Sequence, residues 1–175
     1  MKEKTLWITQ TAMLLALLIV LQAATRGFSQ LVTGSCVNAV LAVTVLTIGL
    51  SSGIIVAAIS PFVAFLLGIG PQLFPIVPTI AVGNIIFVIV LWALAHNHLN
   101  DTKRKILAWC LSAVCKFLAL YIIVVQLICR ILPLPEAQIN VFSTMFSWPQ
   151  LVTALVGGAI ALLLTPKLRS ALSKS

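Results

Sequence analysis

The stretch from Ile106 to Ile131 constrains this chain most, because it is a continuous apolar run with a lysine near its centre. About 20 apolar residues suffice to cross the hydrocarbon core of a bilayer, so the run predicts a membrane-spanning helix. At about 100° per residue, Lys116 and Arg130 lie about 40° apart, on nearly one face. A cation at that depth costs at least about 2.5 kcal/mol, so it normally faces a bundle interior and a partner.

The composition places the rest of the chain in the same class. Of the 175 residues, 61% are hydrophobic and 8% are charged, against about 25% charged in a soluble domain. The net charge of +8 comes from cations at the predicted span ends, which indicates membrane topology and not nucleic-acid binding. The four cysteines have no metal-site or disulfide spacing, so we interpret them as small apolar helix residues.

The hydropathy pattern predicts one all-α, polytopic domain over residues 1–175, a bundle of six transmembrane helices. The expected spans are 5–25, 33–50, 54–69, 79–94, 106–131 and 148–164. Pro61 should kink the third span, and the last should stop at Pro166. The segment 68–78, rich in proline and glycine, should be a rigid non-helical connector, and 132–147 is the longest interruption. The first span could also be a signal peptide, but its long apolar core favours a membrane helix.

The basic residues predict how the bundle lies in the membrane. With the N-terminus inside, the inner segments hold eight of the eleven lysines and arginines, namely Lys2, Lys4, Lys103, Arg104, Lys105, Lys167, Arg169 and Lys174. Because cytoplasmic segments carry an excess of these residues, both termini are predicted to be cytoplasmic, in the cell membrane. The three acids, Glu3, Asp101 and Glu136, then lie outside the hydrocarbon.

In this orientation the embedded polar side chains concentrate in the outer half of the bundle. We therefore predict a pocket open to the outside, floored near Asn84 and Lys116. Since no acid of the chain is expected near Lys116, the counter-charge should arrive with a ligand. The candidate substrate-binding residues are Lys116, Arg130, Asn84, Asn38, Gln126, Gln72, Gln150 and Trp148.

Most of these residues have a structural alternative. The asparagines can join helices by hydrogen bonds, the glutamines can cap helices or lie at the interface, and Trp148 can anchor there. Arg130 and Arg26 can reach lipid headgroups. Lys116 is too central to do so, which favours a functional role over pairing with backbone carbonyls or Asn84.

Two further patterns bear on partners and chemistry. Ala12 and Ala16 form a small-x-x-x-small pair in the first span, which lets another helix approach closely, and Gly157 and Gly158 form a second smooth patch. The chain has no Walker motif and none of the usual hydrolase motifs, so we expect no enzymatic activity, no cofactor and no metal.

Together, several segments resemble a known family. The Ala-x-x-x-Ala pair, the segment Gly34–Leu41 and the segment Pro78–Asn84 follow one another as in the substrate-binding S component of an energy-coupling factor (ECF) vitamin transporter. The resemblance implies that Ala12 and Ala16 dock on a transmembrane coupling subunit, which two cytosolic ATPases drive. It also implies substrate capture near the outer surface under closing loops, although the loop after the first span is short here.

We therefore expect the substrate-capture component of an ECF-type ABC importer for a vitamin or related micronutrient. The lysine favours an anionic ligand, such as a pantothenate-like carboxylate, over a cationic vitamin, and leaves neutral ligands open. The alternatives are a stand-alone secondary transporter or permease for a small metabolite and a non-transporting membrane scaffold. The former commonly uses an intramembrane carboxylate or an internal repeat, and neither is evident in the sequence.

Overall fold

The computed structural model describes residues 2–98 and 101–172, and all regular structure among them is helical. The elements are α1 (Lys2–Ala24), α2 (Gln30–Thr47), α3 (Leu50–Leu66), α4 (Ile76–Ala95), the 3-10 turn η1 (His96–His98), α5 (Thr102–Leu120), the π-helix η2 (Tyr121–Ile128), α6 (Cys129–Ile131), α7 (Glu136–Met145) and α8 (Trp148–Leu172). The prediction of an all-helical chain is confirmed.

Five segments in the described part are long and apolar enough to cross a membrane: Glu3–Ala24, Gln30–Thr47, Ile76–His98, Thr102–Ile131 and Glu136–Ala171. The remaining long helix, α3, is apolar but shorter. The chain is therefore a polytopic membrane protein.

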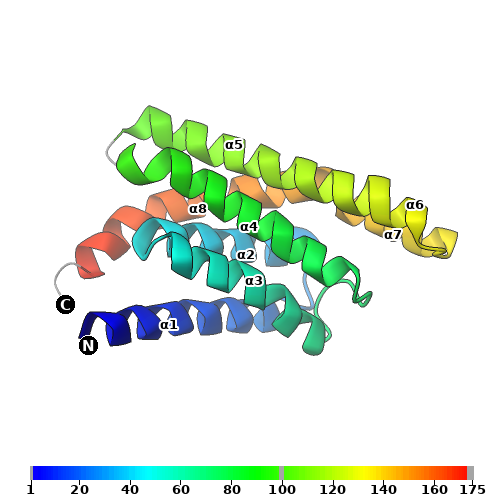
Figure 1. Ribbon diagram of the computed structural model, residues 1–175, viewed down its shortest axis with the longest axis horizontal. Coiled ribbons are helices and arrows are strands. Elements are labelled where there is room, and N and C mark those ends of the chain that lie inside the picture. Colours follow the sequence, from blue (N-terminus) through cyan, green and yellow to red (C-terminus); the bar gives the residue numbers. More distant parts are fainter. Residues whose placement is uncertain (1, 99–100, 173–175) are drawn as a thin grey trace.

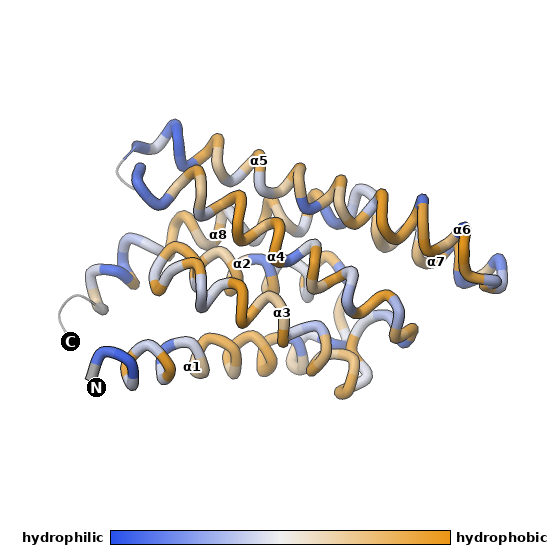
Figure 2. The backbone as a smooth tube through the Cα atoms, in the orientation of Figure 1, coloured by the Kyte–Doolittle hydropathy of each residue, from blue (hydrophilic) through white to orange (hydrophobic). Residues whose placement is uncertain are grey.

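The helices lie roughly along one common axis (Figure 1). The start of α1, the end of α4, the start of α5 and the end of α8 share one end of the bundle, and α6 and α7 lie at the other. Hydrophilic residues gather near both ends, and the helices between them are mostly apolar (Figure 2). The chain thus presents an apolar middle between two polar ends, as a bilayer requires.

The centre of the bundle is the contact between α2 and α8, while α4 packs on α3 and α5. Leu41, Phe87 and Val88 are fully buried in the main apolar core. A second apolar cluster joins the start of α4 to η2 and α7 through Ile76, Val124 and Phe142.

One face of α1 packs on the bundle and the other is exposed. Thr11, Leu18 and Gln22 are buried, and the Thr11 and Ser52 hydroxyls form a 2.7 Å hydrogen bond that ties α1 to α3. Ala12 and Ala16 lie on the exposed side.

Two of the helix boundaries that differ from the sequence prediction involve proline. α4 begins at Ile76, before the predicted start, so Pro78 lies in its first turn. The amide hydrogens of a first turn have no acceptor within the helix, so proline is tolerated there. α8 continues past Pro166 to Leu172, and Pro166 is exposed, so solvent or headgroups can satisfy the carbonyl that it frees.

The predicted interruption at 132–147 contains α7, and the predicted span 106–131 changes its helical geometry midway. From Tyr121 to Ile128 the chain forms π turns, each wider than an α turn. Side chains beyond this segment therefore lose the rotational phase that α-helix spacing predicts for them.

Candidate functional site

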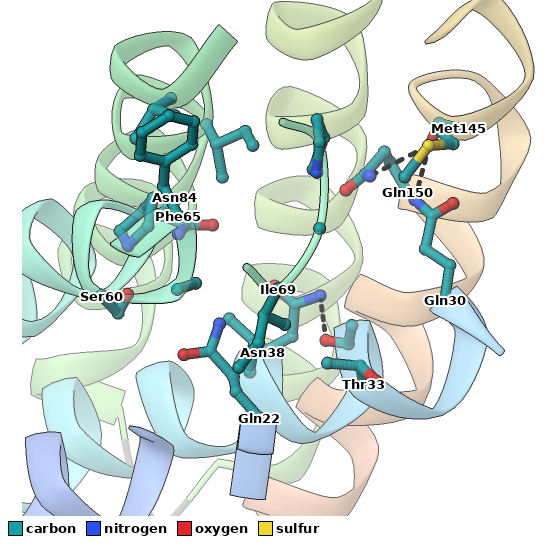
Figure 3. Close-up of a pocket in the computed structure, with 18 of the residues that line it drawn as sticks. Gln22, Gln30, Thr33, Asn38, Ser60, Phe65, Ile69, Asn84, Met145 and Gln150 are labelled. Atoms are coloured by element: carbon teal, nitrogen blue, oxygen red, sulfur yellow. Dashed lines mark hydrogen bonds between the residues drawn. The ribbon is translucent and has the colours of Figure 1, made fainter. Parts of the chain in front are cut away.

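A cavity of about 360 Å³ opens at the end of the bundle opposite the start of α1. Its walls come from the end of α1, the start of α2, the end of α3 and its connector to α4, the first half of α4, the middle of α5 and the corner between α7 and α8 (Figure 3). The lining residues are Gln22, Arg26, Phe28, Gln30, Thr33, Gly34, Val37, Asn38, Ser60, Pro61, Ala64, Phe65, Gly68, Ile69, Gly70, Pro71, Val77, Ile80, Asn84, Lys116, Met145, Phe146 and Gln150.

Lys116 lies on this lining, held between two asparagines. Its ammonium donates to Asn38 Oδ1 at 2.6 Å and to Asn84 Oδ1 at 2.7 Å. All three side chains are buried, with at most 3% of their surface exposed. The Phe87 ring centroid lies 5.6 Å from the ammonium, within the range of a cation–π contact. The lysine therefore points into the bundle and not into lipid.

The asparagine on α2 is itself held in place by α8. Asn38 Nδ2 donates to the carbonyl of Gly34 at 2.9 Å and to Thr153 Oγ1 at 3.3 Å. With its nitrogen engaged there, the carboxamide turns its oxygen toward Lys116. Side chains from α2 and α4 thus hold the ammonium of Lys116 on α5, and this network of hydrogen bonds makes the site rigid.

No carboxylate neutralises Lys116 within the described part of the chain. Glu3, Asp101 and Glu136 are exposed, and Asp101 pairs with Arg104 and caps α5. Two amide dipoles stabilise the ammonium but leave its formal charge in place. A buried charge without a counter-ion attracts an anion strongly.

Gln150 also lines the cavity, where it works together with Gln30. The two side chains donate to the carbonyl of Met145, at 3.0 and 2.8 Å respectively, as drawn in Figure 3. These bonds fasten the corner between α7 and α8 over the cavity, so that Phe146 forms part of its wall.

Four predicted substrate-binding residues do not line this cavity. Arg130 is exposed on α6, Trp148 is 59% exposed, and Gln126 donates to the Tyr121 hydroxyl at 3.0 Å. Gln72 is exposed, and its Nε2 donates to the carbonyl of Gly70 at 3.4 Å. For Arg130 the cause is the π-helix, which rotates it off the face that α-helix spacing would share with Lys116.

The cavity also contains polar residues that the sequence analysis does not predict as ligand contacts. From the sequence, lipid headgroups are the favoured contact of Arg26, and no role is indicated for Gln22, Gln30 or Ser60, yet all four line the cavity. A sequence signal exists for Gln22 alone. It lies one helical turn after Leu18 and three turns after Thr11, so it shares the buried face of α1 with both.

The arrangement suits the binding of a small molecule. Among residues 2–98 and 101–172, no group of three or more His, Cys, Asp or Glu side chains is placed to hold a metal ion. The site combines a buried cation, amide dipoles and an apolar wall, which are typical features of pockets that orient a small ligand.

No curated protein and no solved structure shows significant similarity to the chain. The model of one protein family, the ECF transporter, substrate-specific component, matches residues 7–169. The match covers nearly the whole chain, including every residue that lines the cavity. The chain therefore belongs to the ECF transporter substrate-specific component family, which confirms the resemblance seen in its sequence.

Proposed function

We propose that the chain captures a vitamin or related micronutrient on the extracellular side and delivers it inward with an ATPase-driven coupling module. Membership of the family supports a role in substrate recognition. The cavity supplies a place for the substrate, and the sequence lacks a Walker motif of its own.

The proposed topology has six spans, with both termini in the cytoplasm and the cavity facing outward. The shared position of the start of α1 and the end of α8 supports an even number of crossings. α3 has 17 residues, or about 25 Å at 1.5 Å per residue, slightly less than the roughly 30 Å hydrocarbon core. The chain continues beyond α3 in the connector to α4, which lines the cavity.

The observation on which the ligand proposal depends is the buried ammonium of Lys116, which lines the cavity and has no carboxylate partner among the described residues. We assign to it the binding of a negatively charged group of the substrate. Asn38 and Asn84 hold the ammonium in place, and Gln150 supports the wall beside it.

On the opposite half of the molecule, Ala12 and Ala16 are proposed to dock on the coupling subunit. Both are exposed and small, so a partner helix could approach the α1 backbone closely.

The first test replaces Lys116 with methionine, which keeps the length of the side chain and removes its charge. We expect the affinity for the ligand, identified by mass spectrometry of molecules released from the purified protein, to fall at least about tenfold, as for loss of one charge-assisted hydrogen bond. Binding is measured by titration calorimetry in detergent.

The matched control is Arg130→Gln, which removes a cation from the same long helix but outside the cavity. Its affinity should stay within about twofold of the wild type. Equal affinities for Lys116→Met and the wild type would contradict the role of the lysine. Proton-dependent uptake by the purified chain alone would instead favour a stand-alone transporter, whereas co-purification with an ATPase module would oppose it.

A further inference from the structure

Two buried polar atoms on the cavity wall have no hydrogen-bond partner within the described part of the chain. They are Gln22 Oε1 on α1 and Ser60 Oγ on α3, whose residues are 7% and 1% exposed. Both residues line the cavity, and Figure 3 shows them around the same space as Asn38 and Asn84. Native structures rarely leave such atoms unpaired, so each requires an explanation.

The usual way to satisfy a helical hydroxyl is not used at Ser60. Elsewhere in the bundle, Ser35 and Thr44 donate to the carbonyl four residues earlier, each at 2.7 Å. Ser60 makes no such bond, although the same geometry is open to any serine in a helix. Its hydroxyl is therefore available to a molecule in the cavity.

The unpaired atoms belong to other helices than the cation does. Gln22 and Ser60 belong to α1 and α3, whereas Lys116 belongs to α5, and α1 and α5 run on opposite sides of the bundle (Figure 1). Apolar side chains line the space as well, among them Ile69, Val77 and Phe146. The cavity thus has a charged wall and a neutral polar wall, with apolar surface beside them.

The charges along the cavity have one sign. Lys116 and Arg26 line it, and no aspartate or glutamate of the described ranges does. A cationic ligand would meet repulsion without a compensating carboxylate, and an anion would be attracted. At about 360 Å³, the cavity is near the lower end of ligand pockets, roughly 300–1,000 Å³, so the anion must be small.

We infer that the ligand is a small organic acid with a hydroxyl or amide N–H group separated from its acid group by an apolar stretch. Its acid group binds Lys116, and its hydrogen-bond donor is accepted by Gln22 Oε1 and Ser60 Oγ. This inference rests on the proposed function and deepens it, because it names the chemical class of the substrate and assigns Gln22 and Ser60 to the site.

The test compares matched probes on the purified protein. The probes are ω-hydroxy acids from butyrate to octanoate length, the corresponding acids without the hydroxyl, and the ω-hydroxy primary amides. At the best-fitting length, the hydroxy acid should bind about tenfold more tightly than the plain acid, and more tightly than the hydroxy amide. Equal binding of the three classes at every length, or binding of none of them, would overturn the inference.

Variants then test which residues cause the preference for the hydroxyl group and which cause the preference for the acid group. Ser60→Ala and Gln22→Met should each reduce the preference for the hydroxy acid over the plain acid to about threefold or less, and Lys116→Met should abolish the preference for acid over amide. Each preference is a ratio measured on one sample, so a partial loss of folded protein does not change it. Persistence of the full hydroxyl preference in both Ser60→Ala and Gln22→Met would overturn the assignment.

Ser51→Ala and Gln10→Met make the same changes on the same two helices outside the cavity, and they should leave both ratios unchanged. Uptake through the ATPase module of a substrate that has no acid group would overturn this inference and the anion-binding role of Lys116, and it would leave substrate capture and delivery intact. Failure to associate with any ATPase module would remove the proposed function, whatever the acids do.

Discussion

The chain contains two sets of small residues that look alike in sequence and differ completely in the structure. Gly157 on α8 is buried against α2, whereas Ala12 and Ala16 on α1 are exposed. In the first case the close approach that small residues permit is already used within the molecule. In the second it is still available to another protein.

At Gly157, α2 and α8 approach so closely that no space is left for a side chain. A Cβ atom added there would lie 2.5 Å from the carbonyl oxygen of Ser35, 2.6 Å from Asn38 Cβ and 2.7 Å from the amide nitrogen of Ala39. Two of these neighbours are backbone atoms, which cannot rotate aside. Because Asn38 also holds Lys116, the spacing of α2 and α8 determines the geometry of the site.

The largest effect is therefore expected for Gly157→Ala. The added methyl group must push α2 and α8 apart, which should lower the free energy of unfolding by about 1–3 kcal/mol, as overpacking does elsewhere. Alanine's better helix propensity, roughly 1 kcal/mol, opposes this loss only in part. Thermal and denaturant unfolding in detergent measure the change, and ligand affinity should fall with it.

The matched control is Gly27→Ala, at a turn where an added Cβ meets nothing within 4 Å. Its stability should stay within about 0.5 kcal/mol of the wild type, as for most surface substitutions. Equal stability of Gly157→Ala and Gly27→Ala would contradict the close packing of α8 against α2 at Gly157.

The second prediction concerns the exposed set. Ala16→Trp should leave ligand affinity and stability nearly unchanged, because the side chain points away from the bundle. Uptake by the assembled transporter should fall to background, since a large side chain prevents close approach of a partner helix. Uptake into proteoliposomes, with binding measured on the same preparation, separates the two effects.

Ala93→Trp places the same substitution at another exposed alanine, on α4. It should leave uptake close to the wild-type rate. Equal inhibition by both variants would show that any bulky residue on the outer surface interferes, and would remove the special role of the α1 face.

The sequence was sufficient to predict the features that the bilayer imposes. Lys116 was expected to face inward because a cation in lipid is costly, and the structure buries it beside Asn38 and Asn84. The helical spans follow from the same physics. The cost of placing a group in lipid does not distinguish Gly157 from Ala12 and Ala16, because small apolar residues are tolerated both in lipid and between helices. Which of them is buried depends on how the helices pack.

Other parts of the site could not be predicted, for identifiable physical reasons. The π-helix from Tyr121 to Ile128 has no clear sequence signal, and it carries Arg130 off the face of Lys116. Helical spacing places Gln22 on the face of Thr11 and Leu18 but does not show that a cavity lies there, and Ser60 looks ordinary in sequence because a helical serine usually bonds to a backbone carbonyl. Only three-dimensional packing shows that they meet a cavity instead.

The smallest predicted effect tests how firmly α1 is attached. The Thr11 and Ser52 hydroxyls join it to α3 in a buried site, so Thr11→Val removes one interhelical hydrogen bond while keeping the shape of the side chain. Such bonds contribute about 0.6 kcal/mol on average within membranes, and we expect a loss of that size in the free energy of unfolding.

Thr9→Val is the control, because the hydroxyl of Thr9 is exposed and bonds only to Thr5 in its own helix. A loss as large as that of Gly157→Ala would mean that α1 is held as tightly as α8, and the contrast between a packed and an available helix would fail. A loss near 0.6 kcal/mol leaves α1 the more loosely joined helix, with its small residues free to meet a partner.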